Sequence, residues 1–210
     1  MNSKKKIIIA VSAFALVLLA TIVSVVAVLA AQNVTVRNTI TIQYTVVDVV
    51  ADIEVYAVKV EKDATTINWG TAKKAVFGVD GFDLSSSTGF TEYGTTTDEN
   101  SAAETSFDKF DISKKECVVL KFVFKNNSAS RAFTADLTID GSDSNVSIAH
   151  SSGNVVKPGD ITGTNSQVTV AKSGTTGDTV SYFVKLSIVD ATKNVDEFTP
   201  VFEWALALAS

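Results

Sequence analysis

Apolar and polar side chains alternate over residues 33–46, and this alternation constrains the fold more than any other feature of the chain. The even positions hold the apolar side chains Val34, Val36, Ile40, Ile42, Tyr44 and Val46. The odd positions between them are Thr, Arg or Gln, and only Asn38 interrupts the series. Successive side chains of a β-strand point to opposite faces, so the pattern predicts a strand with one buried face. It is long for a single strand, and a break near Asn38 is expected.

The same two-residue period returns later in the chain and predicts an all-β fold. We expect strands over residues 49–60, 118–124, 131–139, 179–189 and 198–208, and shorter ones around 146–148 and 168–170. Strands and helices do not alternate as they would around a parallel sheet. We therefore predict an antiparallel β-sandwich of the jelly-roll kind. Its core is expected to include Ile42, Tyr44, Leu120, Phe122, Leu137, Val184, Leu186, Phe202 and Trp204.

Residues 84–106 have a different composition and are predicted to form a long polar loop. Half of the residues from 85 to 106 are Ser or Thr. Such a segment offers few apolar side chains to a core. The preceding residues 64–83 contain short apolar pieces between glycines and suit a hairpin or an irregular excursion.

A basic cluster followed by an uncharged apolar run begins the chain. Lysines occupy positions 4–6, and residues 7–31 carry no charge. This is the pattern of a signal peptide or a membrane anchor. We therefore predict that residues 1–31 form a leader and that residues 32–210 form the sandwich domain. With the lysines on the cytoplasmic side, the sandwich is expected to be extracellular or at the cell surface, and residues 7–31 are its expected contact with the membrane.

The charge balance excludes nucleic acid as an electrostatic partner. Without the three lysines of the leader, 15 basic side chains face 23 acidic ones, a net charge of −8. An acidic protein repels phosphate backbones. Cys117 is the only cysteine, so no intramolecular disulfide can form, and its apolar surroundings in the sequence predict a small buried side chain.

Residue patterns that carry catalytic or metal chemistry are scarce. His150 is the only histidine, and no Gly-x-Ser-x-Gly elbow accompanies it. Residues 140–145 are rich in oxygen donors but lack the downstream glutamate of an EF-hand loop. We therefore expect no catalytic residue, no cofactor and no metal. Trp69 precedes a glycine and would be a sugar-binding platform if its ring were exposed.

Several segments resemble exported β-sandwich proteins of Firmicutes related to TasA and camelysin. They are Val-Leu-Lys-Phe-Val-Phe-Lys-Asn-Asn (119–127), Phe-Thr-Ala-Asp-Leu-Thr-Ile (133–139), Lys-Pro-Gly-Asp (157–160), Tyr-Phe-Val-Lys-Leu-Ser-Ile-Val-Asp (182–190) and Phe-Glu-Trp-Ala-Leu (202–206). The resemblance implies a jelly-roll domain that acts as a fibre subunit of an extracellular matrix or biofilm, with strands exchanged between neighbours. Camelysin is described as a protease, but no catalytic residue can be placed on this chain, and we expect no enzyme.

These observations predict an exported cell-surface or matrix structural protein. Its partners would be copies of itself or other surface proteins. The expected self-association strand is an edge strand that carries Val34, Val36, Ile40, Ile42 and Tyr44. Two other functions stay open: a surface-displayed binding module, an adhesin or glycan binder, that uses Trp69 and the polar loop, and a hydrolase whose activity would depend on His150. For residues 33–46 the alternative to exchange is pairing within their own domain.

Overall fold

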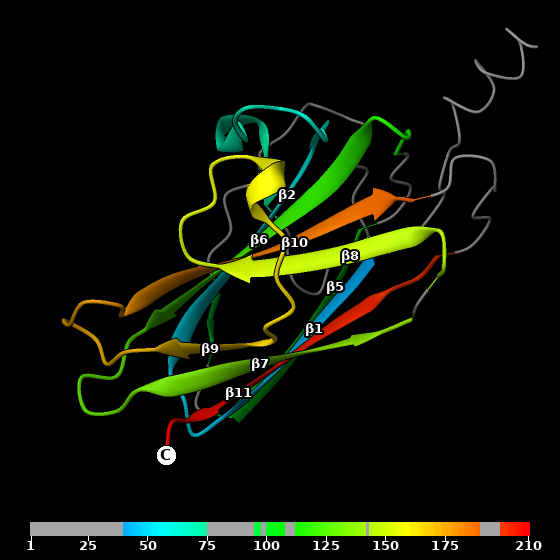
Figure 1. Ribbon diagram of the computed structural model, residues 1–210. Coiled ribbons are helices and arrows are strands. Elements are labelled where there is room, and N and C mark those ends of the chain that lie inside the picture. The colour runs from blue at the N-terminus through cyan, green and yellow to red at the C-terminus, as the bar shows by residue number, and fades with distance from the viewer. Residues whose placement is uncertain (1–39, 75–94, 98–99, 108–111, 142, 190–197) are drawn as a thin grey trace, which may run out of the picture.

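The computed structural model describes residues 40–74, 95–97, 100–107, 112–141, 143–189 and 198–210. They form two β-sheets that pack face to face, so the all-β sandwich predicted from the sequence is confirmed (Figure 1). The predicted leader at residues 1–31 and the predicted break at Asn38 lie outside the described residues.

One sheet has five strands in the order β5-β1-β11-β7-β9. Its strands are β1 (Ile40–Val47), β5 (Asn100–Phe107), β7 (Phe133–Asp140), β9 (Gln167–Val170) and β11 (Val201–Leu208). The pair β1–β11 is parallel and the other pairs are antiparallel, so the prediction of a purely antiparallel sandwich was wrong at this pair. No hairpin joins β1 to β11, and therefore no tight turn forces them to run in opposite directions.

The other sheet has six strands, with the order β3-β2-β6-β10-β8 and β4 also paired to β2. Its strands are β2 (Ala51–Glu61), β3 (Lys73–Lys74), β4 (Thr95–Thr97), β6 (Glu116–Asn126), β8 (Val146–Ser152) and β10 (Thr179–Ile188). All pairs within this sheet are antiparallel. Two short 3-10 helices, η1 (Trp69–Thr71) and η2 (Pro158–Asp160), lie in the connections.

Two strands fall inside the segment that the sequence predicted to be a polar loop. β4 pairs with β2, and β5 pairs with β1 over its whole length. The loop prediction for residues 84–106 was therefore wrong over these strands, while residues 84–94, 98 and 99 lie outside the described part. The error has a physical reason. A strand at the rim of a sheet is held by its backbone hydrogen bonds to one neighbour, and it needs no strong apolar alternation.

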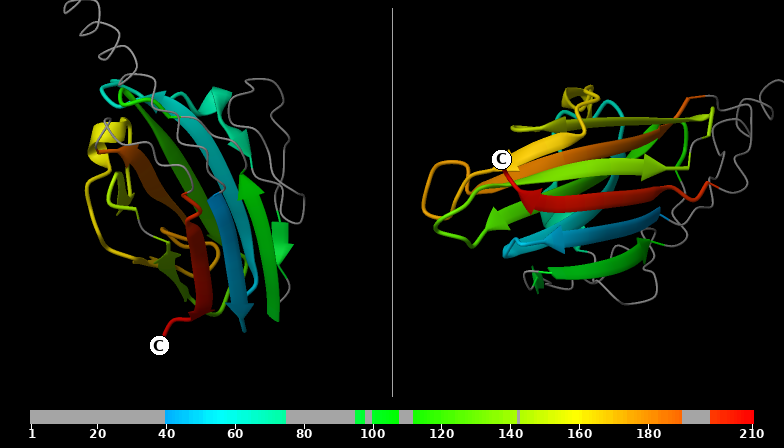
Figure 2. Two further views of the ribbon diagram at one scale, coloured as in Figure 1. Left: turned by 90° about the vertical axis from the view of Figure 1, so that its right-hand side faces the viewer. Right: turned by 90° about the horizontal axis from the view of Figure 1, so that it is seen from below.

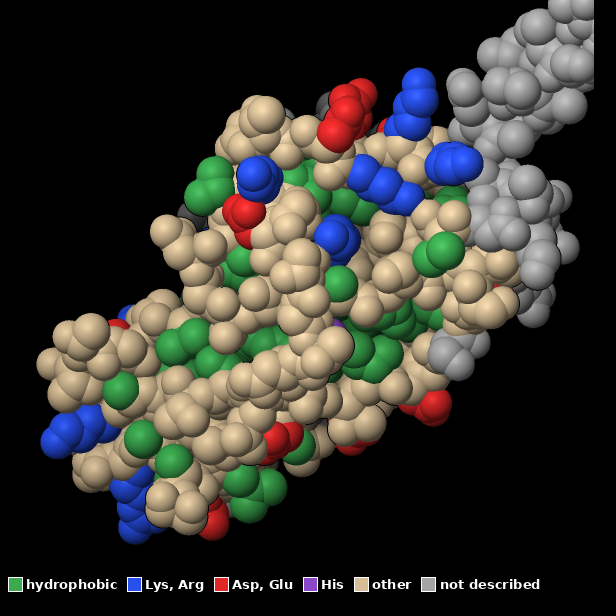
Figure 3. All heavy atoms as spheres, viewed as in Figure 1, with side chains coloured by type: hydrophobic (Ala, Val, Ile, Leu, Met, Phe, Trp, Pro, Cys, Tyr) green, Lys and Arg blue, Asp and Glu red, His purple; other side chains and the backbone are tan. Residues whose placement is uncertain are grey.

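The core lies between the two sheets and contains every residue that the sequence assigned to it, each at most 6% exposed. The ring of Trp204 on β11 packs edge-on against Phe122, Phe124 and Tyr182, with centroid separations of 5.2, 4.9 and 4.9 Å. Such edge-to-face contacts are favourable beyond the area they bury. Partly buried side chains such as Ile139 and Ile148 border this core, and Figure 3 shows hydrophobic side chains reaching the surface between the sheets.

A second hydrophobic cluster lies on the outer face of the six-stranded sheet. It includes Val119 and Phe183 from the strands, and Ile67 and Ile161 from the connections that cover them. The two covering connections are joined, because the backbone N–H of Ile67 donates to the carbonyl of Val156 over 2.7 Å. The residues before β3 and after β8 thus form a partial third layer.

Candidate functional site

Strand β1, the described part of the predicted self-association strand, has a partner on each side. Its register with β11 runs from Thr41–Val201 to Val47–Ala207, and its register with β5 runs from Ile40–Phe107 to Val47–Asn100. Figure 2 shows β1 in blue between β11 in red and β5 in green. The expectation that this strand lies at an edge was therefore wrong in the described sheet, whose rim on this side is β5. Val34 and Val36 lie outside the described residues.

The inward side of β1 is part of the main core. Ile40, Ile42, Tyr44 and Val46 are each at most 2% exposed, and Tyr44 is the register partner of Trp204. Burial of an aliphatic or aromatic side chain stabilises a fold by about 1.5–3 kcal/mol. Together these side chains contribute roughly 6–12 kcal/mol, as much as the whole stability of an ordinary domain. The place of β1 between β5 and β11 therefore has to be filled for the sandwich to stay folded.

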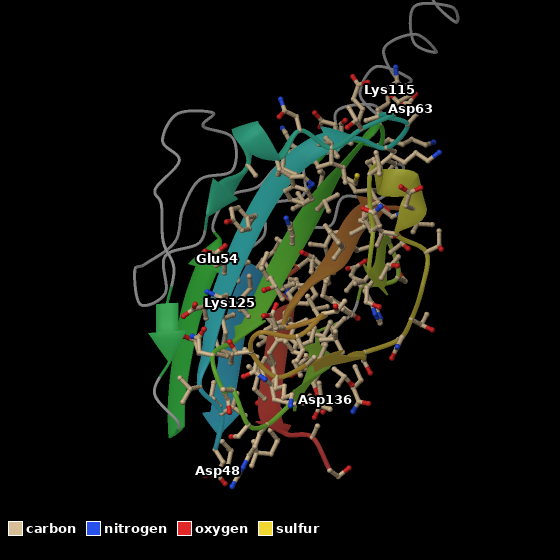
Figure 4. The ribbon with its side chains drawn as sticks, turned by 90° about the vertical axis from the view of Figure 1, so that its left-hand side faces the viewer. Asp48, Glu54, Asp63, Lys115, Lys125 and Asp136 are labelled. Atoms are coloured by element: carbon tan, nitrogen blue, oxygen red, sulfur yellow. The ribbon has the colours of Figure 1, made fainter. Side chains whose placement is uncertain are left out.

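Residues 48–50 carry the chain from β1 in one sheet to β2 in the other. Asp48 has a φ of 56°, in the left-handed region, and Val49 is buried to 2% exposure. The backbone N–H of Asn127 donates to the Val50 carbonyl over 3.0 Å, and the Asn127 side chain donates to Asp52 over 3.0 Å. Figure 4 places Asp48 at the end of the sandwich opposite to Asp63 and Lys115. Within the described residues, this corner is the only covalent connection between β1 and the other strands.

His150 on β8 is a buried structural residue in a small polar network. Its Nδ1 lies 2.9 Å from the Asn165 carbonyl oxygen, and the Tyr182 hydroxyl contacts both groups. Burial raises the pKa of Tyr182, so its hydroxyl stays protonated as a donor. The backbone of His150 also pairs with Gly163, where an added Cβ would approach the His150 carbonyl oxygen to 2.8 Å. These contacts attach the connection after η2 to the edge of the sheet.

Trp69, the candidate sugar platform, is half-buried and packs against the outer face of the six-stranded sheet. Its ring centroid is 5.8 Å from that of Phe183 and 5.4 Å from Nζ of Lys121, which also lies 5.6 Å from the Tyr56 ring. A lysine over aromatic faces is held by the ring quadrupoles. The ring of Trp69 therefore anchors the segment around η1 through intramolecular contacts.

The remaining candidate residues have local roles. Asp140 Oδ1 accepts from the Gly141 N–H at 2.8 Å and Asp143 Oδ1 from the Asn145 N–H at 2.7 Å, so both carboxylates close their own turns. Within the described ranges no group of three or more His, Cys, Asp or Glu side chains is placed to hold a metal ion. Cys117 is fully buried, as predicted, and burial raises the pKa of its thiol to about 11. None of the helices in the described residues is long and apolar enough to span a membrane.

Two features of the β1 region escaped the sequence reasoning. Residue 48 was recognised as the end of a strand, but its left-handed backbone was not predicted. The sequence feature that could have predicted this conformation is the aspartate between Val47 and Val49, because Asp is one of the few non-glycine residues that enter the left-handed region. The pairing of β1 with β5 had no signal in the side chains, since β5 lacks apolar alternation.

No family model matches the chain, and no curated protein matches it. Among solved structures, the mu homology domain of Fcho1 from Danio rerio with bound Eps15 peptide has a TM-score of 0.20 and 4% identity, covering 86% of this chain and 99% of that chain. The yeast delta-COP-I mu-homology domain complexed with a Dsl1 WxWxV peptide has a TM-score of 0.13 and 6% identity, with coverage of 82% and 96%. TM-scores this low do not define a shared fold.

Proposed function

We propose that this protein is an exported structural subunit of the cell surface or extracellular matrix, whose copies associate by exchanging β1. The observation that supports this function best is the way in which β1 is attached. It fills the core with four side chains, yet residues 48–50 are its one described covalent link to the other strands. A strand that is joined to the other described strands through one corner can leave its own sheet and occupy the same place in a second copy.

The energetics favour exchange over simple release of the strand. Release alone would forfeit the burial of β1, roughly the whole stability of the domain. Exchange restores the same contacts with β5 and β11 in another copy, so its net free-energy cost is small. The equilibrium between monomer and exchanged assembly then depends on protein concentration. If each copy donates its strand to the next, the contact is head-to-tail and open-ended, which produces filaments. In this proposal residues 1–31 export the jelly-roll-like domain or anchor it until assembly.

A cross-linking experiment between two variants of the full chain, each with one introduced cysteine, tests this function. Thr45 on β1 and Ala205 on β11 are register partners, and both are exposed. Neighbouring strands lie about 4.7–4.9 Å apart, within the Cα separation that a disulfide bridges. Thr45→Cys with one affinity tag is mixed with Ala205→Cys carrying another, incubated at high concentration and oxidised. Exchange predicts a covalent dimer containing one copy of each variant. Native Cys117 is buried and protonated and does not compete.

The matched control uses two register partners that belong to the same copy both in the monomer and in the exchanged assembly. Asp136 on β7 is the other register partner of Ala205, and neither strand is exchanged in the proposal. A mixture of Asp136→Cys and Ala205→Cys should therefore give only the background of random collisions. If the Thr45 mixture gives no more mixed dimer than this control, β1 stays in its own copy and the proposed function is wrong.

A further inference from the structure

The corner between β1 and β2 holds a residue in the left-handed conformation, which Asp tolerates better than most side chains but less freely than glycine. Asp48 is the single non-glycine residue with positive φ in the described part of the chain, at 56°. For an L-residue the left-handed conformation brings Cβ close to the following carbonyl oxygen. Such strain persists only where the surroundings enforce it. Here the surroundings are β1 and β2, which must lie in opposite sheets although only residues 48–50 separate them.

Exposed apolar side chains flank the strained residue on both sides. Val47 is 49% exposed and Val50 is 37% exposed, two of the four large hydrophobic residues with high exposure in the described ranges. The Val50 carbonyl is held by the N–H of Asn127, and Val49 is buried, so the C-terminal part of the corner is fixed to the body of the domain. The freedom to open therefore lies at residues 47 and 48.

We propose that residues 47 and 48 are the hinge of strand exchange and that the residue at position 48 sets the balance between the closed monomer and the exchanged assembly. This inference rests on the exchange proposed above. On opening, Asp48 relaxes to an extended conformation. Corners of two adjoining copies then run side by side, and Val47 and Val50 gain apolar neighbours that they lack in the monomer. Relief of the backbone strain at Asp48 and burial of Val47 and Val50 therefore both favour the exchanged assembly over the monomer.

Substitutions at position 48 change the strain without touching the contacts of β1. Glycine enters the left-handed region freely, so Asp48→Gly should favour the monomer and lower the equilibrium yield of exchange by about two- to fivefold. Valine is β-branched and tolerates that region poorly, so Asp48→Val should raise the yield by about tenfold. Asp48→Asn keeps the tolerance for positive φ and removes the charge, so it serves as the control and should leave the yield unchanged.

The measurement is the yield of mixed covalent dimer from Thr45→Cys and Ala205→Cys chains that both carry the same residue at position 48. The predicted order is Val above Asp and Asn, with Gly lowest. A second readout uses the double variant Thr45→Cys/Ala205→Cys, oxidised as a monomer so that β1 stays in its own sheet. In this closed form Asp48→Val should lower the denaturant midpoint relative to Asp48→Asn.

The outcomes separate this inference from the function on which it rests. If the chains with native Asp48 exchange but the Val, Gly and Asn variants all give the same yield, the hinge inference is overturned and the exchange remains. If chains with native Asp48 do not exchange, both are overturned. Should the Val variant fail to fold, the Gly and Asn variants decide, because equal yields from those two also contradict a strained hinge.

Discussion

The buried side chains of the core follow the two-residue period, but the polar network beside them also includes a residue from a connecting segment, where no period applies. His150 and Tyr182 occupy inward positions on β8 and β10 and are bonded to the Asn165 carbonyl from a connecting segment. A buried hydroxyl needs a partner, and here the partner comes from a residue with no periodic pattern. The network therefore holds a loop in place over the edge of the sandwich.

Replacing Tyr182 by Phe should destabilise the domain modestly. The hydroxyl contacts the Asn165 carbonyl and His150 Nδ1, but the imidazole can still bond the same carbonyl after the hydroxyl is lost. The expected loss is about 0.5–1.5 kcal/mol in the free energy of unfolding, measured by urea titration. Tyr56→Phe is the matched control, because its hydroxyl bonds Glu54 at 2.6 Å in a half-buried position, and it should change stability less. An equal loss from both variants would contradict a special role for the Tyr182 network.

The strands with strong alternation were predicted well, and those held by backbone pairing alone were not. β6, β7, β10 and β11 bury a face against the opposite sheet, so their sequences carry the apolar signal. β5 has small and polar residues and was assigned to a loop. The parallel direction of β11 beside β1 was also beyond prediction, because register between remote strands depends on the whole fold. For the candidate site, the strand at residues 40–47 and the burial of Ile40, Ile42 and Tyr44 were predicted, but the neighbouring strands were not, and the role of this strand in self-association stays a prediction.

The connection around η2 contains a carboxylate whose ionisation should be visible in the pH dependence of stability. Asp160 Oδ2 accepts from the backbone N–H groups of Lys157 and Val156, each at 3.0 Å, and these bonds lower the pKa of Asp160 below its ordinary value of 3.8. A carboxyl group with a lower pKa in the folded state stabilises the fold above its ordinary pKa, and this contribution disappears as pH falls through the folded value. Asp160→Asn should therefore lower the melting temperature at neutral pH.

Melting curves from pH 7 to below pH 3 check this expectation. The difference between the wild type and Asp160→Asn should shrink as the pH falls below the ordinary value of 3.8. Asp63→Asn removes another acidic side chain, at the end of the sandwich opposite to Asp48 (Figure 4), and controls for the change in net charge. A difference that stays constant across this range would show that the backbone bonds to Asp160 do not depend on its ionisation.

The whole molecule has a core that needs the side chains of β1, and among the described strands β1 is joined to the others only through the corner at residues 48–50. No disulfide is available to fasten that strand, since Cys117 is the only cysteine and is buried on another face. The outer side of β1 presents exposed Thr45 and Val47, and its inward side chains and two backbone ladders help to hold the strand in place. Both kinds of interaction can be reproduced in a second copy, which is why the proposed function follows from the attachment of β1.

Electron microscopy of the purified protein, with β1 reversibly fastened, tests this function most directly. The variant Thr45→Cys/Ala205→Cys is oxidised at low concentration, which joins β1 to β11 within one copy, and is then concentrated with or without reductant. We expect filaments only after reduction, with monomers persisting in the oxidised sample. Reduced protein that stays monomeric at high concentration, or oxidised protein that forms filaments equally well, would contradict assembly through β1.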